Sequence, residues 1–195
     1  KKKKDPRIKK EYKKILFYKK KIKFVYQNKP LGTGDAVLKT QHKIKSKFFL
    51  VLLPDDLIIN KNCSKEIIKV HNKYKSSVMA SMKVQKNNVS RWGIYSLSKN
   101  LNKNNFLISD VVEKPKINKA PSNNAVCGRY ILDKKIFSIL KKLKKGRGGE
   151  YQITDAIKIL IKENSKFVGH KFKGKYLDCG TMHGYIKSSL EISKS

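Results

Sequence analysis

The stretch FFLVLLPDDLII, Phe48 to Ile59, decides the fold class. Its first half is a continuous apolar run, and Pro54 ends that run with two aspartates directly behind it. Such a run, bounded by a proline, is typical of a strand that is buried on both faces, as in a mostly parallel sheet. The stretch therefore predicts a strand in the interior of a layered α/β domain.

Helical and strand patterns alternate on both sides of this stretch. Helices are expected over residues 7–20, 35–42, 64–74, 134–143, 155–162 and 182–192. Further strands are expected over residues 22–27, 76–84, 92–98, 104–115, 125–132 and 167–178. The segments 92–98 and 104–115 should form an antiparallel pair, and Thr154 should cap the helix that follows it. This order predicts a single α/β domain over residues 1–195, with a Rossmann-like mixed, mostly parallel sheet.

The formal net charge of +33, from 47 Lys and Arg against 14 Asp and Glu, has two explanations. A basic excess of this size is found in proteins that bind nucleic acid or anionic membranes. However, the cations are nearly all lysines spread along the whole chain, beside abundant asparagine and isoleucine. These three residues share A/T-rich codons, so a biased genome gives the same composition. No nucleic-acid motif is visible, and we favour the compositional explanation.

Cysteine usage and hydropathy indicate the compartment. The three cysteines, Cys63, Cys127 and Cys179, are widely spaced and form neither a C-x-x-C pair nor a zinc-like spacing with histidine. No apolar run reaches the roughly 18 to 20 residues that cross a bilayer, and the lysine-rich start is unlike a secretory signal. We therefore expect a cytoplasmic protein without a membrane partner.

Two of the four polar segments that follow apolar strands lie in the first third of the chain. Gln27 precedes the glycine-containing turn 31–36, where a backbone without side chains can approach a ligand and the amide can pair with a nucleobase. An ordinary strand–turn–helix connection explains this turn as well. Asp55 and Asp56 follow Pro54, where they can hold Mg²⁺ or form a turn.

The other two segments lie in the second half of the chain. Glu113 and Lys114 end an apolar strand, where they can bind a sugar hydroxyl and a phosphate, or form a surface ion pair. Asp178 precedes a small turn that opens a helix, so it can share a metal with Asp55 or cap that helix. Gly93, after the only tryptophan, can let a sugar lie against the backbone, or belong to an apolar wall.

Taken together and in order, six segments resemble the bacterial UTP–glucose-1-phosphate uridylyltransferase family. They are QNKPLGTGDAV, LLPDD, RWGIYSL, VVEKPKINKAPSNNAVCGRYIL, GRGGEYQITDAI and GKYLDCGTMHGYIKSSLE, and they extend from about Val25 to the C-terminus. The pair VEKP and APSNNAVCGRY is the most specific of them, and EYQITDAI favours uridylyltransferases over the related thymidylyltransferases. The resemblance implies a nucleotidyltransferase fold, Mg²⁺ as cofactor, and the formation of UDP-glucose and pyrophosphate from UTP and glucose 1-phosphate.

The resemblance also implies roles for particular residues. Asp55, Lys114 and Asp178 would be catalytic, with both aspartates as Mg²⁺ ligands and Lys114 on the sugar phosphate. Gly128 would leave room beside the sugar. The remaining implied substrate contacts are Gln27 and Gly32 for uracil, and Gly93, Glu113 and Val126 for glucose.

One feature of the family is missing from the sequence. The family begins with a glycine-rich G-x-G-T-R loop that cradles the triphosphate, and the run Lys1–Lys4 lacks the glycine backbone for that purpose. We therefore expect an N-terminally truncated chain that is inactive alone. Relatives commonly form homo-oligomers. Two alternatives stay open: a thymidylyltransferase or other sugar-nucleotide pyrophosphorylase, and a basic nucleic-acid-binding protein on a decayed transferase scaffold.

Overall fold

The main sheet is arranged around its longest strand, β6 (Asn124–Asp133), in a computed structural model that describes residues 5–194. Lys1–Lys4, discussed above, lie outside the described residues. The strand order is β1-β6-β3-β7-β5-β4, and β4 pairs a second time with β6, which closes a ring of five strands. The other strands of this sheet are β1 (Phe48–Leu52), β3 (Ser77–Lys83), β4 (Gly93–Asn100), β5 (Asn105–Glu113) and β7 (Phe167–Lys171).

The sheet is mixed, as predicted, but the prediction that it is mostly parallel is wrong. Only β3 and β7 run parallel, whereas β6 is antiparallel to β1, β3 and β4, and β5 is antiparallel to β4 and β7. The pattern misled because an antiparallel strand between two neighbours, such as β6, is also buried on both faces. The stretch Phe48–Leu52 itself is only half-buried, since β1 lies at the edge of the described sheet.

One edge of β6 is divided between two partners. β3 follows the other edge from Asn124 to Ile131. On the divided edge, β4 pairs with β6 at Ala125 and β1 pairs with it from Arg129 onward. Residues 126–128 therefore lie where β1 and β4 diverge. A divergence of neighbouring strands is where α/β proteins commonly place a ligand crevice.

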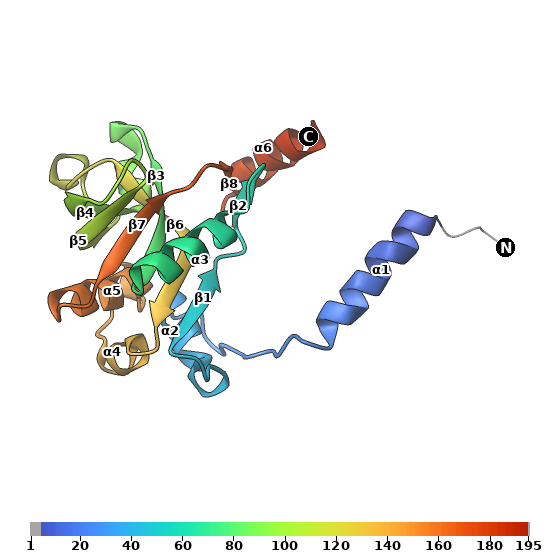
Figure 1. Cartoon of the computed structure of the whole chain (residues 1–195), viewed down its shortest axis with the longest axis horizontal. Coiled ribbons are helices and arrows are strands. Elements are labelled where there is room, and N and C mark those ends of the chain that lie inside the picture. Colours follow the sequence, from blue (N-terminus) through green and yellow to red (C-terminus); the bar gives the residue numbers. More distant parts are fainter. Residues whose placement is uncertain (1–4, 195) are drawn as a thin grey trace.

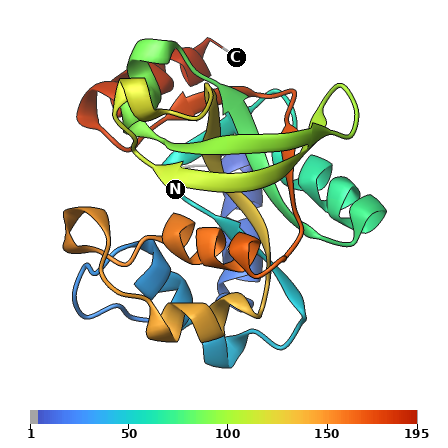
Figure 2. The ribbon, with the colours of Figure 1, turned by 90° about the vertical axis from the view of Figure 1, so that its left-hand side faces the viewer.

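Helices cover the sheet on both sides (Figures 1 and 2). α3 (Cys63–Tyr74) packs on β3, β6 and β7, and its Ile67 and Val70 belong to the smaller core of that side. On the opposite side the larger core contains residues of α2 (Thr33–Lys39), α4 (Ile136–Lys142) and α5 (Ile153–Lys162). None of the described helices is long and apolar enough to span a bilayer. The short 3₁₀ helices are η1 (Gln41–Lys43), η2 (Lys86–Arg91), η3 (Ile117–Lys119) and η4 (Arg147–Gly149).

A separate two-stranded ribbon carries the C-terminal helix. β2 (Asp56–Ile59) pairs antiparallel with β8 (Lys175–Asp178), and α6 (Met182–Ser193) follows directly. The sequence reading did not separate β2 from β1, because both lie in one apolar stretch. Pro54 and Asp55 form the turn between them, and this turn becomes part of the candidate site.

The N-terminal segment contains one confirmed helix and one strand prediction that is wrong. α1 (Pro6–Lys19) has no buried residue and extends away from the sheet in Figure 1. Residues 22–27 form no strand, although they are rich in β-branched and aromatic residues, and Phe24 and Tyr26 are 72% and 81% exposed. A strand requires a neighbour for its backbone groups, and within residues 5–194 none pairs with this segment.

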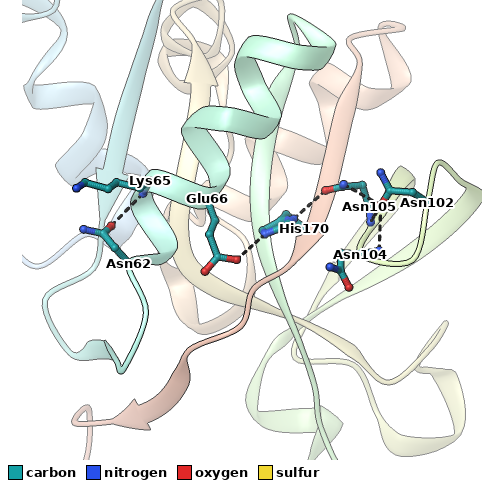
Figure 3. Close-up of polar contacts among 7 residues, drawn as sticks. All are labelled: Asn62, Lys65, Glu66, Asn102, Asn104, Asn105 and His170. Atoms are coloured by element: carbon teal, nitrogen blue, oxygen red, sulfur yellow. Dashed lines mark hydrogen bonds and ion pairs between the residues drawn. The ribbon is translucent and has the colours of Figure 1, made fainter.

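A buried histidine ties α3 to the sheet (Figure 3). His170 on β7 lies between Glu66 of α3, 3.1 Å from its Nε2, and Asn105 of β5, 2.8 Å from its Nδ1. The His170 side chain is buried and Glu66 is partly exposed. Both neighbours offer oxygen atoms, so the imidazole links three elements that are far apart in the sequence.

We expect His170→Leu to destabilise the fold by about 1 to 3 kcal/mol, because it leaves the Glu66 carboxylate and the Asn105 carbonyl without this partner. Urea denaturation measures the free energy of unfolding. His42→Leu is the matched control, since His42 is exposed. Equal unfolding free energies for the two variants would contradict a structural role for His170.

Candidate active site

A cavity of about 580 Å³ opens where β1 and β4 diverge along β6. Val126 and Gly128 of β6 line it, together with residues of the chain segments that follow β1, β5 and β8. Seven of the nine residues implied by the resemblance line it, namely Asp55, Gly93, Glu113, Lys114, Val126, Gly128 and Asp178. These seven residues come from five separate parts of the sequence, and the fold brings them together at one cavity.

The two aspartates Asp55 and Asp178 meet across the β2–β8 ribbon. Asp178 lies opposite Asp56 in the strand register, and the Cys179 amide donates to the Asp55 carbonyl at 2.8 Å. Gly180 lies between the two carboxylates: a Cβ there would be 3.0 Å from Asp55 Oδ2 and 3.4 Å from Asp178 Oδ1. Both carboxylates therefore border the same small space in the cavity.

A cation already lies at one of these carboxylates. Arg91, the last residue of η2, donates from Nη2 to Asp178 Oδ2 at 2.7 Å, and its guanidinium lies 5.4 Å from the Trp92 ring centre. Within residues 5–194, no group of three or more His, Cys, Asp or Glu side chains could by itself hold a metal. Mg²⁺ commonly takes only one or two carboxylates and completes its shell with water and phosphate oxygens. The pair Asp55 and Asp178 fits that requirement.

Asp56 acts as an anchor between the ribbon and β6. It accepts hydrogen bonds from the Tyr176 hydroxyl and from the Gly128 amide, the latter at 2.7 Å. Burial raises the pKa of Asp56 above its ordinary value, and these two donors partly offset that effect. Arg129 donates to the Asp56 and Leu53 carbonyls from the same side. This network fixes the turn that carries Asp55.

The same network gives a reason for glycine at position 128 that differs from the expectation. The Cβ direction of Gly128 points at the Asp56 carboxylate and the Leu53 side chain, and a methyl group there would overlap both. The space that this glycine leaves is thus filled by the protein's own side chains. Gly128 lines the cavity and also permits the anchor.

Glu113 and Lys114 form the opposite rim, at the end of β5. Glu113 pairs with Gly93 across the β4–β5 hairpin, and its Oε2 accepts a 2.8 Å hydrogen bond from the Thr154 hydroxyl. Lys114 has φ of +43°, a left-handed conformation that side chains rarely adopt, and its amide donates to the Trp92 carbonyl at 2.9 Å. Such backbone strain costs on the order of 1 to 3 kcal/mol and clusters at functional sites.

The prediction that Thr154 caps its helix is wrong. α5 begins at Ile153, and the side chain of its N-cap residue, Gln152, makes no capping hydrogen bond. The Ile153 amide donates instead to Thr33 Oγ1 at 3.4 Å. The Thr154 hydroxyl is instead directed to Glu113, and the residue is buried. Sequence proximity favoured the local partner, but the packing of α5 against β5 brought a carboxylate within reach.

The two remaining residues, Gln27 and Gly32, lie together but do not line the cavity. Gln27 donates from Nε2 to Asp35 at 2.7 Å and to the Gly32 carbonyl at 3.2 Å, so its amide nitrogen stabilises its own turn. Gly32 has φ of +103° and packs against the Tyr151 backbone, where a Cβ would be 2.8 Å from the carbonyl oxygen. The neighbouring Thr33 is the residue of this turn that reaches the cavity.

Several residues in or beside the cavity were not predicted as part of the site. Among them are Arg91 and Thr154, which line the cavity, and Arg129 and Tyr176, which hold Asp56. Arg91, Arg129 and Tyr176 each stand next to or two positions from a named site residue, whereas Thr154 lies in the segment EYQITDAI, far from any of them in the sequence. The signal was present, but the partners of these side chains are distant in the sequence and became visible only in the structure.

Comparison with known proteins defines the class. The profile of the family described as "Nucleotidyl transferase" matches residues 1–195, and the chain belongs to this family. Within it, the sequence and the fold are similar to those of UTP–glucose-1-phosphate uridylyltransferases, which are also called UDP-glucose pyrophosphorylases. This confirms the resemblance inferred from the six segments.

Two curated relatives and two solved structures illustrate the similarity. The chain is 37% identical to a putative UTP–glucose-1-phosphate uridylyltransferase of Methanocaldococcus jannaschii, over 88% of this chain and 59% of the relative. It is 35% identical to the UTP–glucose-1-phosphate uridylyltransferase of Pseudomonas aeruginosa, over 81% of this chain and 57% of the relative. The chain thus spans less than two thirds of these relatives' length.

The structures agree in fold. A UDP-glucose pyrophosphorylase complexed with UDP-glucose superimposes with a TM-score of 0.83 at 37% identity, covering 88% of this chain and 66% of the other. A UTP-bound enzyme from Acinetobacter baumannii gives a TM-score of 0.71 at 32% identity, covering 84% of this chain and 57% of the other. The mixed α/β architecture described above is therefore shared with these proteins.

We expect only one of the three thiols to react with Ellman's reagent at pH 8 in the folded chain. Burial raises the pKa of Cys63 to about 12 and that of Cys127 well above its usual range, whereas Cys179 is partly exposed beside Asp178. All three should react in guanidinium chloride. Three thiols reacting at one rate in the folded chain would contradict the burial described here.

Proposed function

We propose that the chain carries the sugar- and metal-binding part of a nucleotidyltransferase that makes UDP-glucose and pyrophosphate from UTP and glucose 1-phosphate. The observation that supports this proposal is the convergence of Asp55, Asp178, Glu113 and Lys114 on one cavity. Family membership supports nucleotidyl transfer, and the printed names of the similar proteins support UTP and glucose 1-phosphate as the substrates.

The chemistry requires positioning more than acid–base catalysis. A phosphate oxygen of glucose 1-phosphate attacks the α-phosphorus of UTP, and pyrophosphate leaves as the new P–O bond forms. Asp55 and Asp178 would hold Mg²⁺, which when bound neutralises phosphate charge. Lys114 would hold the sugar phosphate, and Glu113 would accept hydrogen bonds from glucose hydroxyls. Gly93 and Val126 would let the sugar lie close to β4 and β6.

The distribution of acidic residues argues against a nucleic-acid partner at this cavity. Five of the fourteen acidic residues of the chain line it, namely Asp55, Asp56, Glu113, Glu150 and Asp178. A groove that follows a nucleic-acid backbone is lined by cations, because it must neutralise phosphates. Clustered carboxylates in a chain of net charge +33 favour a metal-assisted site with few, placed cations.

The 195 residues contain no G-x-G-T-R loop, so ligand binding is a more direct test than turnover. We expect UDP-glucose to bind saturably and Mg²⁺ to strengthen its binding, as measured by isothermal titration calorimetry. Asp55→Ala and Asp178→Ala should each abolish the Mg²⁺ effect, because each removes a carboxylate ligand. Asp110→Ala is the control, since Asp110 lies on β5 outside the cavity.

Several outcomes would contradict parts of this proposal. A Mg²⁺ response that is unchanged in both aspartate variants removes the metal assignment. Tighter binding of dTDP-glucose than of UDP-glucose assigns the chain to the thymidylyltransferase branch. Tight, steeply salt-dependent binding of RNA or DNA together with no binding of UDP-glucose replaces the proposal by the nucleic-acid alternative.

We further expect Lys114→Ala to weaken the binding of glucose 1-phosphate by about 1.5 to 3 kcal/mol, through loss of a charge-assisted contact. Calorimetric titration with glucose 1-phosphate measures this effect, and titration with uncharged glucose serves as the ligand control. Lys116→Ala is the matched protein control, because Lys116 is an exposed lysine two positions away. Equal affinity in the Lys114 and Lys116 variants would rule out the phosphate role.

A further inference from the structure

We propose that Thr154 is a positioning residue that gives the site its discrimination between sugars, by holding the Glu113 carboxylate in one orientation. This inference rests on the proposed function, because it concerns how the sugar of that ligand is recognised. It names a residue on α5 that touches Glu113 and acts through it.

The first observation is the contact itself. Thr154 Oγ1 donates to Glu113 Oε2 at 2.8 Å. Thr154 is 5% exposed, so water competes little for this hydrogen bond. The bond joins the first turn of α5 to the last residue of β5, the two elements that form this wall of the cavity.

The second observation is that the hydroxyl has no role in the helix. A threonine in the first turn commonly donates or accepts locally, and a capping role would make it structural. Here the Ile153 amide of the first turn donates to Thr33 Oγ1 at 3.4 Å, and the Thr154 hydroxyl reaches a carboxylate 41 positions earlier in the sequence. The bond serves the cavity wall.

The third observation is the crowding around Gly93, the register partner of Glu113. A Cβ at position 93 would be 3.2 Å from Glu113 Oε2, 3.2 Å from Thr154 Cγ2 and 3.0 Å from Val126 Cγ2. The Glu113 carboxylate is therefore confined between the β4 backbone and Thr154. The glycine allows this close approach, and the threonine fixes the direction.

The consequence for recognition follows from the two oxygens of Glu113. A carboxylate only accepts hydrogen bonds, and Oε2 already accepts one from Thr154. Oε1 accepts none from the residues that the structure describes, and Glu113 lines the cavity. In this orientation Oε1 is the oxygen that meets a sugar hydroxyl, so only hydroxyls at the right position and configuration are satisfied.

The N-terminus of α5 supports the same arrangement. Its first backbone amides carry partial positive charge, which attracts a carboxylate. Gln152, Ile153 and Thr154 all line the cavity, so the helix end and the Glu113 carboxylate share one wall. Without the threonine hydroxyl this attraction remains, but nothing selects which oxygen turns toward the helix, and the carboxylate can rotate.

The test compares Thr154→Val, which keeps the shape and removes the hydroxyl, with Thr154→Ser, which keeps the hydroxyl. Dissociation constants are measured for UDP-glucose, UDP-galactose and UDP. We expect Thr154→Val to weaken UDP-glucose about tenfold, the equivalent of one lost hydrogen bond, and to leave UDP within about twofold. Discrimination against UDP-galactose should fall, and Thr154→Ser should behave as the unchanged chain. Should Thr154→Val not fold, as judged by circular dichroism, Thr154→Ala removes the same hydroxyl.

A double-mutant cycle with Glu113→Ala shows whether Thr154 acts through Glu113. We expect Thr154→Val to cause no additional loss of UDP-glucose affinity in the Glu113→Ala background. Equal losses in both backgrounds, or equal losses for UDP and UDP-glucose, would overturn the inference, because a general structural defect would explain them. Unchanged affinities in Thr154→Val would overturn it while the proposed function stands. If the unmodified chain binds neither UDP nor UDP-glucose, the proposed function fails and the inference fails with it.

Discussion

The site depends on one constraint, the division of a single edge of β6 between two strands. β4 takes this edge at Ala125 and β1 takes it from Arg129 onward, so the backbone between them faces an opening. The segments that line the cavity surround this opening. They are the turn after β1, the end of β5 beside β4, and the start of α5, which packs on β5. A sheet with continuous pairing along β6 would close the space.

The cavity is rich in acidic residues, although the chain as a whole is strongly basic. Only a few cations lie among these carboxylates. Arg91 neutralises Asp178, and Asp56 is held by Tyr176 and Gly128. These pairings make it tolerable to hold several acidic groups in a confined space, where unpaired charges would be costly.

The sequence predicted the fold class correctly, but it did not predict the relative direction of the strands or the hydrogen-bond partner of Thr154. Helices and most strands lie where the patterns placed them, because burial periodicity and propensity are local properties. The prediction of a mostly parallel sheet was wrong, because a fully apolar strand has the same sequence pattern between parallel and antiparallel neighbours. The strand at residues 22–27 failed because pairing needs a second segment. The Thr154 hydroxyl went to Glu113 because the contact was made by packing, not by proximity along the chain.

The sequence by itself determined the mixed α/β class, the family, and which loops carry polar residues at strand ends, because these are written in residue types at fixed spacing. Only the tertiary structure decided that Asp55 and Asp178 border the same space, that Gly128 makes room for Asp56, and that Thr154 holds Glu113. Each of these is a meeting of residues far apart along the chain. Such meetings depend on strand register and on the packing of helices against the sheet, and neither is encoded in any one segment.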